Sequence, residues 1–432
     1  MTSVYKSKND KAWERLFDQY RILDEINARG RFIISSTQIN PERESRLMAK
    51  VDQFINLPQI FRKNQLSILP VSRSAYIIAP FITHQLVTYS PSLEPIKKSL
   101  PPNIQSIDDS DLYSEAVALN CAYLTGMIDD IIGEQSYYTI SGRMSTESFH
   151  FSIHSTILGD PASQIDVNNS QCEIDGGFEG EQCFALVEAK NYTVEDFLIR
   201  QLYYPYRLWS AKLSKRVIPI FMTFSQDIFD FFIYEFVDEK DYNSLQLIEQ
   251  KSYTLTPKTI STADVNAILT QAHIIPEPLS IPFPQADSFK RIVDLLTLLM
   301  VKDRLTRDEI TEEYQFDARQ TNYYTDAARY LGLVNKFIDP DTQEITFQLT
   351  DEAQIILRQR HKQKYLGLIR KILERVVFNR SFRLWLQQGT IRDDEIGRII
   401  EDSHIPIQGA TVGRRARTVR GWIAWIMQQT ED

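Results

Sequence analysis

Four prolines within nine residues constrain this chain more than any other feature of its sequence: Pro276, Pro278, Pro282 and Pro284. A helix cannot hold so many prolines, because each one removes a backbone donor and fixes its own φ. The segment 274–288 is therefore predicted to be an extended linker between separately folded domains. The chain has 432 residues, which is enough for two to four domains, each with its own core.

The segment 1–105 is predicted to be an N-terminal accessory domain. Apolar residues recur at helical spacing over 12–28, which predicts a first helix. Asn40-Pro41 is typical of a helix start, so a second helix is expected over 41–55. That helix would place three basic side chains on one face: Arg43, Arg46 and Lys50. Two interpretations of this face remain open, contact with DNA phosphates and simple solvation.

The segment 106–273 has the pattern of an α/β domain. A helix is expected over 113–132 and a second over 194–213. Runs rich in β-branched and aromatic residues predict strands at 147–153, 171–178, 182–189, 217–224 and 229–236. The second helix falls between the third and fourth of these strands, so the order is helix, strands, helix and strands, which indicates an α/β unit.

The segment 289–354 has the pattern of a winged helix-turn-helix domain. Helices are expected over 289–301, 306–314 and 317–330, and a hairpin follows at 334–338 and 344–349. Such a domain lays its third helix in the major groove of DNA. The side chains suited to base contact there are Arg319, Gln320, Asn322 and Tyr323. Protein contact is the alternative role of this domain.

The segment 355–432 is predicted to be a basic, helical, helix-turn-helix-like domain. From residue 355 onward there are 15 Lys and Arg against 8 Asp and Glu, whereas the first 354 residues carry 33 against 49. The overall charge of −9 therefore conceals a basic tail, which could bind a polyanion. The predicted helix 409–427 carries the basic side chains proposed for DNA contact: Arg414, Arg415 and Arg417.

Several classes of protein are excluded by what the sequence lacks. Its longest strongly apolar run, 292–301, is interrupted by Asp294 and is too short for a membrane helix. There is no GxxxxGK[ST] motif for ATP. The three cysteines are odd in number and widely spaced, which supports neither a disulfide framework nor a zinc site. With no export signal at its polar start, the chain is expected to be cytoplasmic.

The residues most suggestive of chemistry are Asp175-Gly176-Gly177 and, further on, Glu188-Ala189-Lys190. Side chains alternate along a strand, so Glu188 and Lys190 should project together. The glycines permit a turn or bulge after Asp175, which could bring its carboxylate to the same point. Paired carboxylates suit Mg²⁺, and a neighbouring ammonium can offset charge that develops on a phosphate. The pattern therefore predicts a phosphodiester hydrolase.

The spacing of Glu188 and Lys190 is weak by itself, because both residue types are common. Glu249-Gln250-Lys251 repeats the same spacing, but it lacks the glycine turn and the long helix that follow the first site. The alternative interpretation of Glu188 and Lys190 is an ion pair on the solvent face of a strand. The surrounding order of helix, strands, helix and strands favours the catalytic interpretation.

Taken together, the stretch resembles the PD-(D/E)XK nuclease superfamily, with Ile174-Asp175 in place of the usual Pro-Asp. The resemblance implies a restriction-endonuclease-like core, a mixed sheet flanked by helices. It also implies that Asp175 and Glu188 ligate one or two Mg²⁺ ions and that Lys190 assists the nucleophile. Glu115 and Gln201 would line the same site, as the acid of the preceding helix and the glutamine of the following one.

The runs 201–207 and 411–425 look like those of prokaryotic type II restriction endonucleases. This narrower resemblance implies a cytoplasmic, prokaryotic, sequence-specific endonuclease that cuts double-stranded DNA and has a cognate DNA methyltransferase as genetic partner. Cutting both strands calls for two catalytic centres or sequential nicks, so a homodimer is expected. Two alternatives remain: a structure-specific repair or recombination nuclease, and a DNA-binding regulator with an inactive nuclease-like core.

Overall fold

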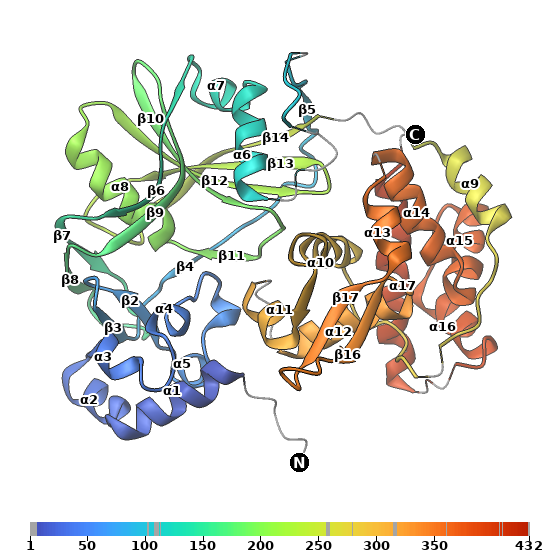
Figure 1. Ribbon diagram of the computed structural model, residues 1–432, viewed down its shortest axis with the longest axis horizontal. Coiled ribbons are helices and arrows are strands. Elements are labelled where there is room, and N and C mark those ends of the chain that lie inside the picture. The colour runs from blue at the N-terminus through green and yellow to red at the C-terminus, as the bar shows by residue number, and fades with distance from the viewer. Residues whose placement is uncertain are drawn as a thin grey trace. The chain divides into compact units, whose positions relative to one another are not determined.

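A computed structural model describes residues 7–101, 103–107, 112, 114–255, 260–278, 280–313, 318–359, 361–405, 407 and 409–430 (Figure 1). The chain divides into two compact units. The first unit contains Met1–Gln105 and Ser114–Leu255, and the second contains Ser106–Tyr113 and Thr256–Asp432. Each unit is a mixture of helices and strands.

The first unit begins with short helices packed on a three-stranded sheet. The helices are α1 (Lys8–Gln19), α2 (Ile22–Arg29), α3 (Ser36–Ile39), α4 (Ser45–Met48), η1 (Phe54–Asn56) and α5 (Gln59–Lys63). The strands are β1 (Phe32–Ser35), β2 (Ser67–Pro70) and β3 (Ala75–Ala79), in the order β1-β3-β2 with antiparallel pairing. Trp13, Phe17 and Phe61 form the aromatic centre of this core, with ring centroids 4.8–6.2 Å apart.

Neither predicted helix of this region is continuous. The 12–28 helix is broken at Arg21, whose φ of 51° lies outside the helical range. The 41–55 helix is wrong: Asn40 is the C-cap of α3, and its side chain accepts a hydrogen bond from the Ser45 amide at 2.8 Å. Within that span α4 and the start of η1 form, and the carbonyl of Met48, the last residue of α4, accepts from Trp13 Nε1 at 3.0 Å. A local side-chain cap and one tertiary hydrogen bond therefore stand where a continuous helix was expected.

A seven-stranded mixed sheet forms the centre of the first unit, in the order β5-β14-β13-β12-β10-β9-β6. Its strands are β5 (Ile96–Lys97), β6 (Tyr137–Ser145), β9 (Gln171–Glu179), β10 (Cys183–Lys190), β12 (Arg216–Ser225), β13 (Ile228–Phe236) and β14 (Leu245–Thr254). The β10–β12 and β14–β5 pairs are parallel, and the other neighbours are antiparallel. The five strands expected from sequence are present, four in this sheet and β7 beside it, whereas β6, β8 and β14 were not anticipated.

Three helices accompany this sheet: α6 (Glu115–Leu124), α7 (Met127–Ile132) and α8 (Arg200–Lys212). Tyr123 of α6 packs on Phe178, while Trp209 of α8 packs on Phe184. Phe178 pairs with Ala185, the neighbour of Phe184, so α6 and α8 cover opposite faces (Figure 1). The expected 113–132 helix is split where Gly126 takes a φ of 73°, and the expected 194–213 helix starts only at Arg200.

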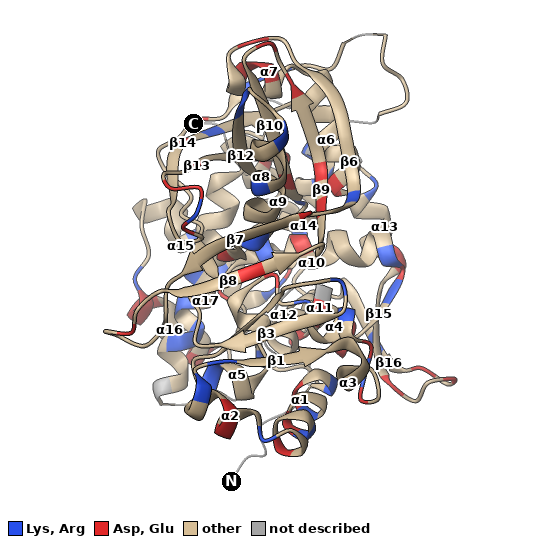
Figure 2. Cartoon of the chain, turned by 90° about the vertical axis from the view of Figure 1, so that its left-hand side faces the viewer, with Lys and Arg blue, Asp and Glu red and all other residues tan. Residues whose placement is uncertain are grey.

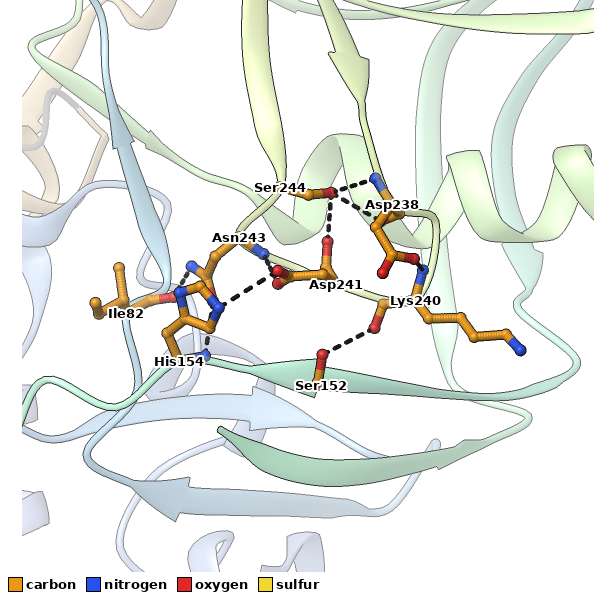
Figure 3. A network of polar contacts seen from close by, with 8 residues as sticks. All are labelled: Ile82, Ser152, His154, Asp238, Lys240, Asp241, Asn243 and Ser244. Carbon is orange, nitrogen blue, oxygen red and sulfur yellow. Dashed lines mark hydrogen bonds and ion pairs between the residues drawn. The ribbon is translucent and has the colours of Figure 1, made fainter. Parts of the chain in front are cut away.

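Two small sheets complete the first unit. One pairs β7 (Ser148–Ile153) with β8 (Ser163–Asn168), and the other pairs β4 (His84–Leu86) with β11 (Asp196–Leu198). Figure 3 shows how the loop after β13 is fastened to β7: Asn243 accepts from the His154 amide at 2.8 Å, and Asp241 lies 3.3 Å from the His154 ring. His154 is thus part of a network of polar contacts between β7 and this loop.

The segment 1–105 is not a compact unit by itself. β4 pairs with β11, and β5 extends the seven-stranded sheet at β14, so strands from before residue 105 complete sheets built after it. The first unit therefore spans both predicted N-terminal and central segments. Acidic and basic residues are mixed along α1 and α2 (Figure 2), so these helices present no surface of a single charge sign.

The second unit is mainly helical. Its helices are α9 (Thr262–Gln271), α10 (Phe289–Lys302), α11 (Arg307–Glu313), α12 (Ala318–Tyr330), α13 (Asp351–Leu357), α14 (His361–Leu373), α15 (Val376–Gln388), α16 (Asp393–Asp402) and α17 (Ala410–Gln428). Strands β15 (Arg304–Thr306), β16 (Val334–Ile338) and β17 (Ile345–Leu349) form a sheet in the order β15-β17-β16. The helices and the hairpin expected from sequence are present, and β15 adds a third strand.

The proline-rich segment packs inside the second unit. Its described residues form no helix, but Phe283 stacks on Phe378 at 5.9 Å and the Ala286 carbonyl accepts from Trp422 Nε1 at 2.8 Å. It is therefore part of a core, and the division between the units lies earlier, after Leu255. In the described part of the chain, no helix has both the length and the apolar character needed to cross a membrane.

Candidate active site

The carboxylate of Asp175 is positioned by a bulge in β9. Between Gly177 and Ile174 β9 advances three residues while β6 advances two, from Ile140 to Gly142. The β9–β10 ladder ends just before Asp175, whose Oδ2 accepts instead from the Ala189 amide at 2.8 Å. The side chain thus replaces a ladder contact and is held beside the end of β10.

Glycine is required where β9 bends. A Cβ on Gly176 would lie 2.8 Å from Leu119 of α6 and 2.8 Å from the Phe178 ring. A Cβ on Gly177 would lie 2.8 Å from the Phe184 ring. Both glycines therefore allow a helix and an aromatic side chain to approach the strand that carries Asp175.

Glu188 and Lys190 project together, as the strand alternation predicted. Lys190 Nζ donates to Glu188 Oε1 at 2.6 Å, and Gln201 Nε2 donates to the same oxygen at 2.5 Å. Glu115 Oε1, at the start of α6, lies 3.9 Å from Lys190 Nζ. The structure therefore brings together the five residues that the sequence nominated, from β9, β10, α6 and α8.

This cluster is not an ion pair on a solvent face. Glu188 is 7% exposed and Lys190 is 8% exposed, whereas the Glu115 side chain is 38% exposed. Lys190 also donates to the Ala189 carbonyl at 3.1 Å. Burying a charge pair costs several kcal/mol of desolvation per ion. Glu188 and Lys190 therefore do not have the surroundings of an ordinary ion pair on the surface of a strand.

The pKa values of the cluster are shifted upward. Burial raises the pKa of Glu188 well above its usual 4.5, and the charges of Asp175 and Glu115 add to this effect while Lys190 opposes it. Partial burial likewise raises the pKa of Glu115, against the pull of Lys190. For Lys190, burial lowers the pKa, but Glu188, Glu115 and Asp175 outweigh it and raise it above 10.5. Burial is the main cause of the raised pKa of the two glutamates, whereas the three carboxylates around one ammonium raise the pKa of Lys190.

The donor set fits a divalent cation. Three carboxylates against one ammonium leave an excess of two negative charges when all are ionised, which one divalent cation would balance. Gln201 Oε1 is buried with no hydrogen-bond partner among the described residues, so an oxygen acceptor is also free. As the described side chains stand, no group of three or more His, Cys, Asp or Glu is close enough to hold a metal, and Lys190 Nζ lies against Glu188.

The second Glu-X-Lys sequence has different surroundings. Glu249 is exposed on β14, and Lys251 Nζ donates to the Asp130 carbonyl at 2.9 Å. Arg207 of α8 donates to the His150 carbonyl at 2.9 Å and to Tyr203 Oη at 3.0 Å. These side chains hold the fold together and gather no second set of carboxylates.

The three basic residues expected on one N-terminal helix are separated. Arg43 precedes α4 and donates to Asn9 Oδ1 at 2.7 Å, Arg46 is exposed on α4, and Lys50 is exposed after it. Of these three, Lys50 has a charge that lowers the pKa of Glu115. The charge of Asp52 raises the same pKa. No sequence signal indicated these two effects, because they depend on the tertiary packing of segments that are distant in the chain.

The candidates for base contact lie on α12. Arg319 is exposed, and its Nε donates to Tyr323 Oη at 2.5 Å. Gln320 and Asn322 are half-buried. On α17, Arg414 and Arg417 are exposed and Arg415 is half-buried. Burial and then the neighbouring Arg414 lower the pKa of Arg415, while Tyr323 of α12 raises it, so the two groups of candidates lie near each other.

Three family models match this chain, each described as a domain of unknown function. Residues 10–78 match DUF6996, residues 79–254 match DUF6997 and residues 291–431 match DUF7226. Comparison with curated proteins and with solved structures found no match. The cluster around Glu188 lies within the second matched region, and the helices α12 and α17 lie within the third.

Proposed function

We propose that this protein is a Mg²⁺-dependent DNA endonuclease of the PD-(D/E)XK superfamily. The observation that supports this most strongly is the meeting of Asp175, at the bulge in β9, with Glu188 and Lys190, at the end of β10, and with Glu115 and Gln201 from the flanking helices. These are the residue types and the strand positions that the sequence resemblance implies for a phosphodiester hydrolase. The mixed sheet between α6 and α8 agrees with a core of that kind.

Asp175 and Glu188 are the residues that would hold the cation, with Glu115 as a third carboxylate. A bound divalent cation supplies charge stabilisation to the phosphate and lowers the pKa of a water. Gln201 fixes Glu188 through its amide N–H and leaves Oε1 free to accept from a water. Lys190 remains protonated near neutral pH and provides positive charge beside the reacting phosphate.

The second unit supplies a DNA-binding surface in this proposal. Its helices α10, α11 and α12 with the β16–β17 hairpin have the element order of a winged helix-turn-helix. Arg319, Gln320, Asn322 and Tyr323 would contact bases, and Arg414, Arg415 and Arg417 would contact phosphates. The proximity of Arg415 to Tyr323 supports one continuous surface across α12 and α17.

Within this class, we favour a type II restriction endonuclease that acts as a homodimer on double-stranded DNA beside a cognate methyltransferase. The test is incubation of supercoiled plasmid with the protein and Mg²⁺, in parallel with Asp175→Asn and Lys190→Ala. Discrete fragments that both variants abolish would support the proposal. Cutting restricted to branched or mismatched DNA would favour a repair nuclease, and binding without cutting would favour an inactive regulator.

A further inference from the structure

The segment that follows α4 is fixed against the edge of the candidate site. The Asp52 carbonyl accepts from the Leu198 amide at 2.8 Å, and the Phe54 amide donates to Asp196 Oδ1 at 2.8 Å. Both partners belong to β11, which leads directly into α8. Since Gln201 of α8 binds Glu188, only a few residues of chain separate this anchored segment from the centre of the cluster.

A second anchor fixes the same segment on its other side. His84 Nε2 donates to the Val51 carbonyl at 2.9 Å, and burial lowers the pKa of His84 to about 4. The ring is therefore neutral near pH 7 and keeps this hydrogen bond. Val51 and Gln53 are buried, at 2% and 3% exposure. A segment held at Val51, Asp52 and Phe54 has a defined backbone position, so the backbone of Lys50, the residue before it, is placed as well.

Lys50 directly precedes this segment, and its charge lowers the pKa of Glu115 in the cluster. Partial burial is the main cause that raises the pKa of Glu115, and Lys50 is among the charges that lower it. Unlike Lys190, Lys50 is exposed. The structure gives its ammonium no hydrogen bond or ion pair within the described part of the chain. Lys50 is thus a cation at the edge of the site that is available to an incoming anion.

We propose that Lys50 is a substrate-binding residue, whose ammonium contacts a backbone phosphate of the DNA strand beside the bond to be cut. A lysine ammonium acts as a point charge and binds phosphate without fixed geometry. The inference rests on the proposed nuclease function and extends it. Lys50 lies in the region matched at 10–78, and the carboxylates lie in the region matched at 79–254. The site is then built by both regions.

The test measures DNA binding and its salt dependence in the full chain. The parent protein carries Asp175→Asn, which blocks cutting and keeps an oxygen acceptor for the Ala189 amide. Fluorescence anisotropy with a mixed-sequence duplex in Ca²⁺ compares this parent with added Lys50→Ala, Lys50→Arg or Lys63→Ala. Lys63 is an exposed lysine of α5 and serves as the matched control. Wild-type cutting of plasmid is measured separately.

We expect Lys50→Ala to weaken binding and to reduce the slope of log affinity against log salt by about 0.9, the loss of one phosphate contact. Lys50→Arg should restore the slope, and Lys63→Ala should not change it. If the wild type cuts plasmid but Lys50→Ala behaves like Lys63→Ala, the role of Lys50 is refuted and the nuclease proposal stands. If the wild type neither binds nor cuts DNA, both proposals fail.

Discussion

Replacing Lys190 with methionine should destabilise the first unit, and more so at high pH. The ammonium lies 2.6 Å from Glu188, a separation worth about 6 kcal/mol of direct attraction at an effective dielectric constant of 20. Desolvation of the lysine offsets part of this. Glu115, at 3.9 Å and 38% exposed, adds less because solvent screens it. Removal of one partner from a buried pair costs about 3–5 kcal/mol, which is the loss expected at pH 8.

The pH dependence follows from the raised pKa values of Glu188 and Glu115. A raised folded-state pKa means that the native state binds more protons than the unfolded chain above pH 4.5. The stability that this proton binding contributes is lost as pH rises. Without Lys190, the Glu188 and Glu115 carboxylates lose the nearby positive charge, and protons bound to them must compensate for it. Each extra proton bound by the native state changes the free energy of unfolding by about 1.4 kcal/mol per pH unit. The deficit of Lys190→Met should therefore shrink markedly at pH 5.

Urea titration of the full chain at pH 5 and pH 8, followed by circular dichroism, measures both effects. The control is Lys215→Met, because Lys215 lies at the same 2.6 Å from Glu179 but both side chains are about a third exposed. An exposed pair contributes only about 0–1 kcal/mol. If Lys190→Met changes the unfolding free energy as little as Lys215→Met at both pH values, the argument that the cluster is a buried excess of carboxylates is refuted.

Three further predictions concern the cation, the glycines and the basic helix. Mg²⁺ should raise the melting temperature more at pH 8 than at pH 6, because it binds ionised carboxylates and releases protons, and Glu188→Gln should abolish most of this shift in a thermal melt. Gly176→Ala should cost about 1–3 kcal/mol by overpacking, whereas Gly413→Ala, on α17 with open space around it, should stabilise by about 0.5–1 kcal/mol in urea titration. Arg414→Ala should weaken duplex binding and lower the salt slope by about one without changing kcat.

Periodicity was a good guide to strands and a poor guide to where helices break. Runs of β-branched and aromatic residues located the strands that carry Asp175 and Glu188, because a buried strand needs such residues along its whole length. The expected helices near the N-terminus failed at Arg21, which takes a positive φ, and at Asn40, whose side chain accepts from the Ser45 amide. The α4 helix that does form is also fixed by a partner remote in sequence, because its Met48 carbonyl accepts from Trp13.

The proline-rich segment shows the same limit. Its prolines correctly predicted that the described residues form no helix, since each removes a backbone donor and fixes φ wherever it occurs. They could not show whether that backbone separates two units or crosses a core. Phe283 and Ala286 pack and bond within the second unit, and this depends on a complementary surface on α15 and α17 that only the folded chain presents.

Residues close together in the chain determined the centre of the candidate site. Asp175, the two glycines, Glu188 and Lys190 lie on two consecutive strands, where alternation and a bulge are local properties that sequence expresses directly. The tertiary structure alone decided that Glu188 and Lys190 are buried, that Glu115 and Gln201 reach them from opposite faces of the sheet, and that the charge of Lys50 lowers the pKa of Glu115. Those facts depend on how separate segments pack, and packing is set by the fit of whole surfaces that no local pattern encodes.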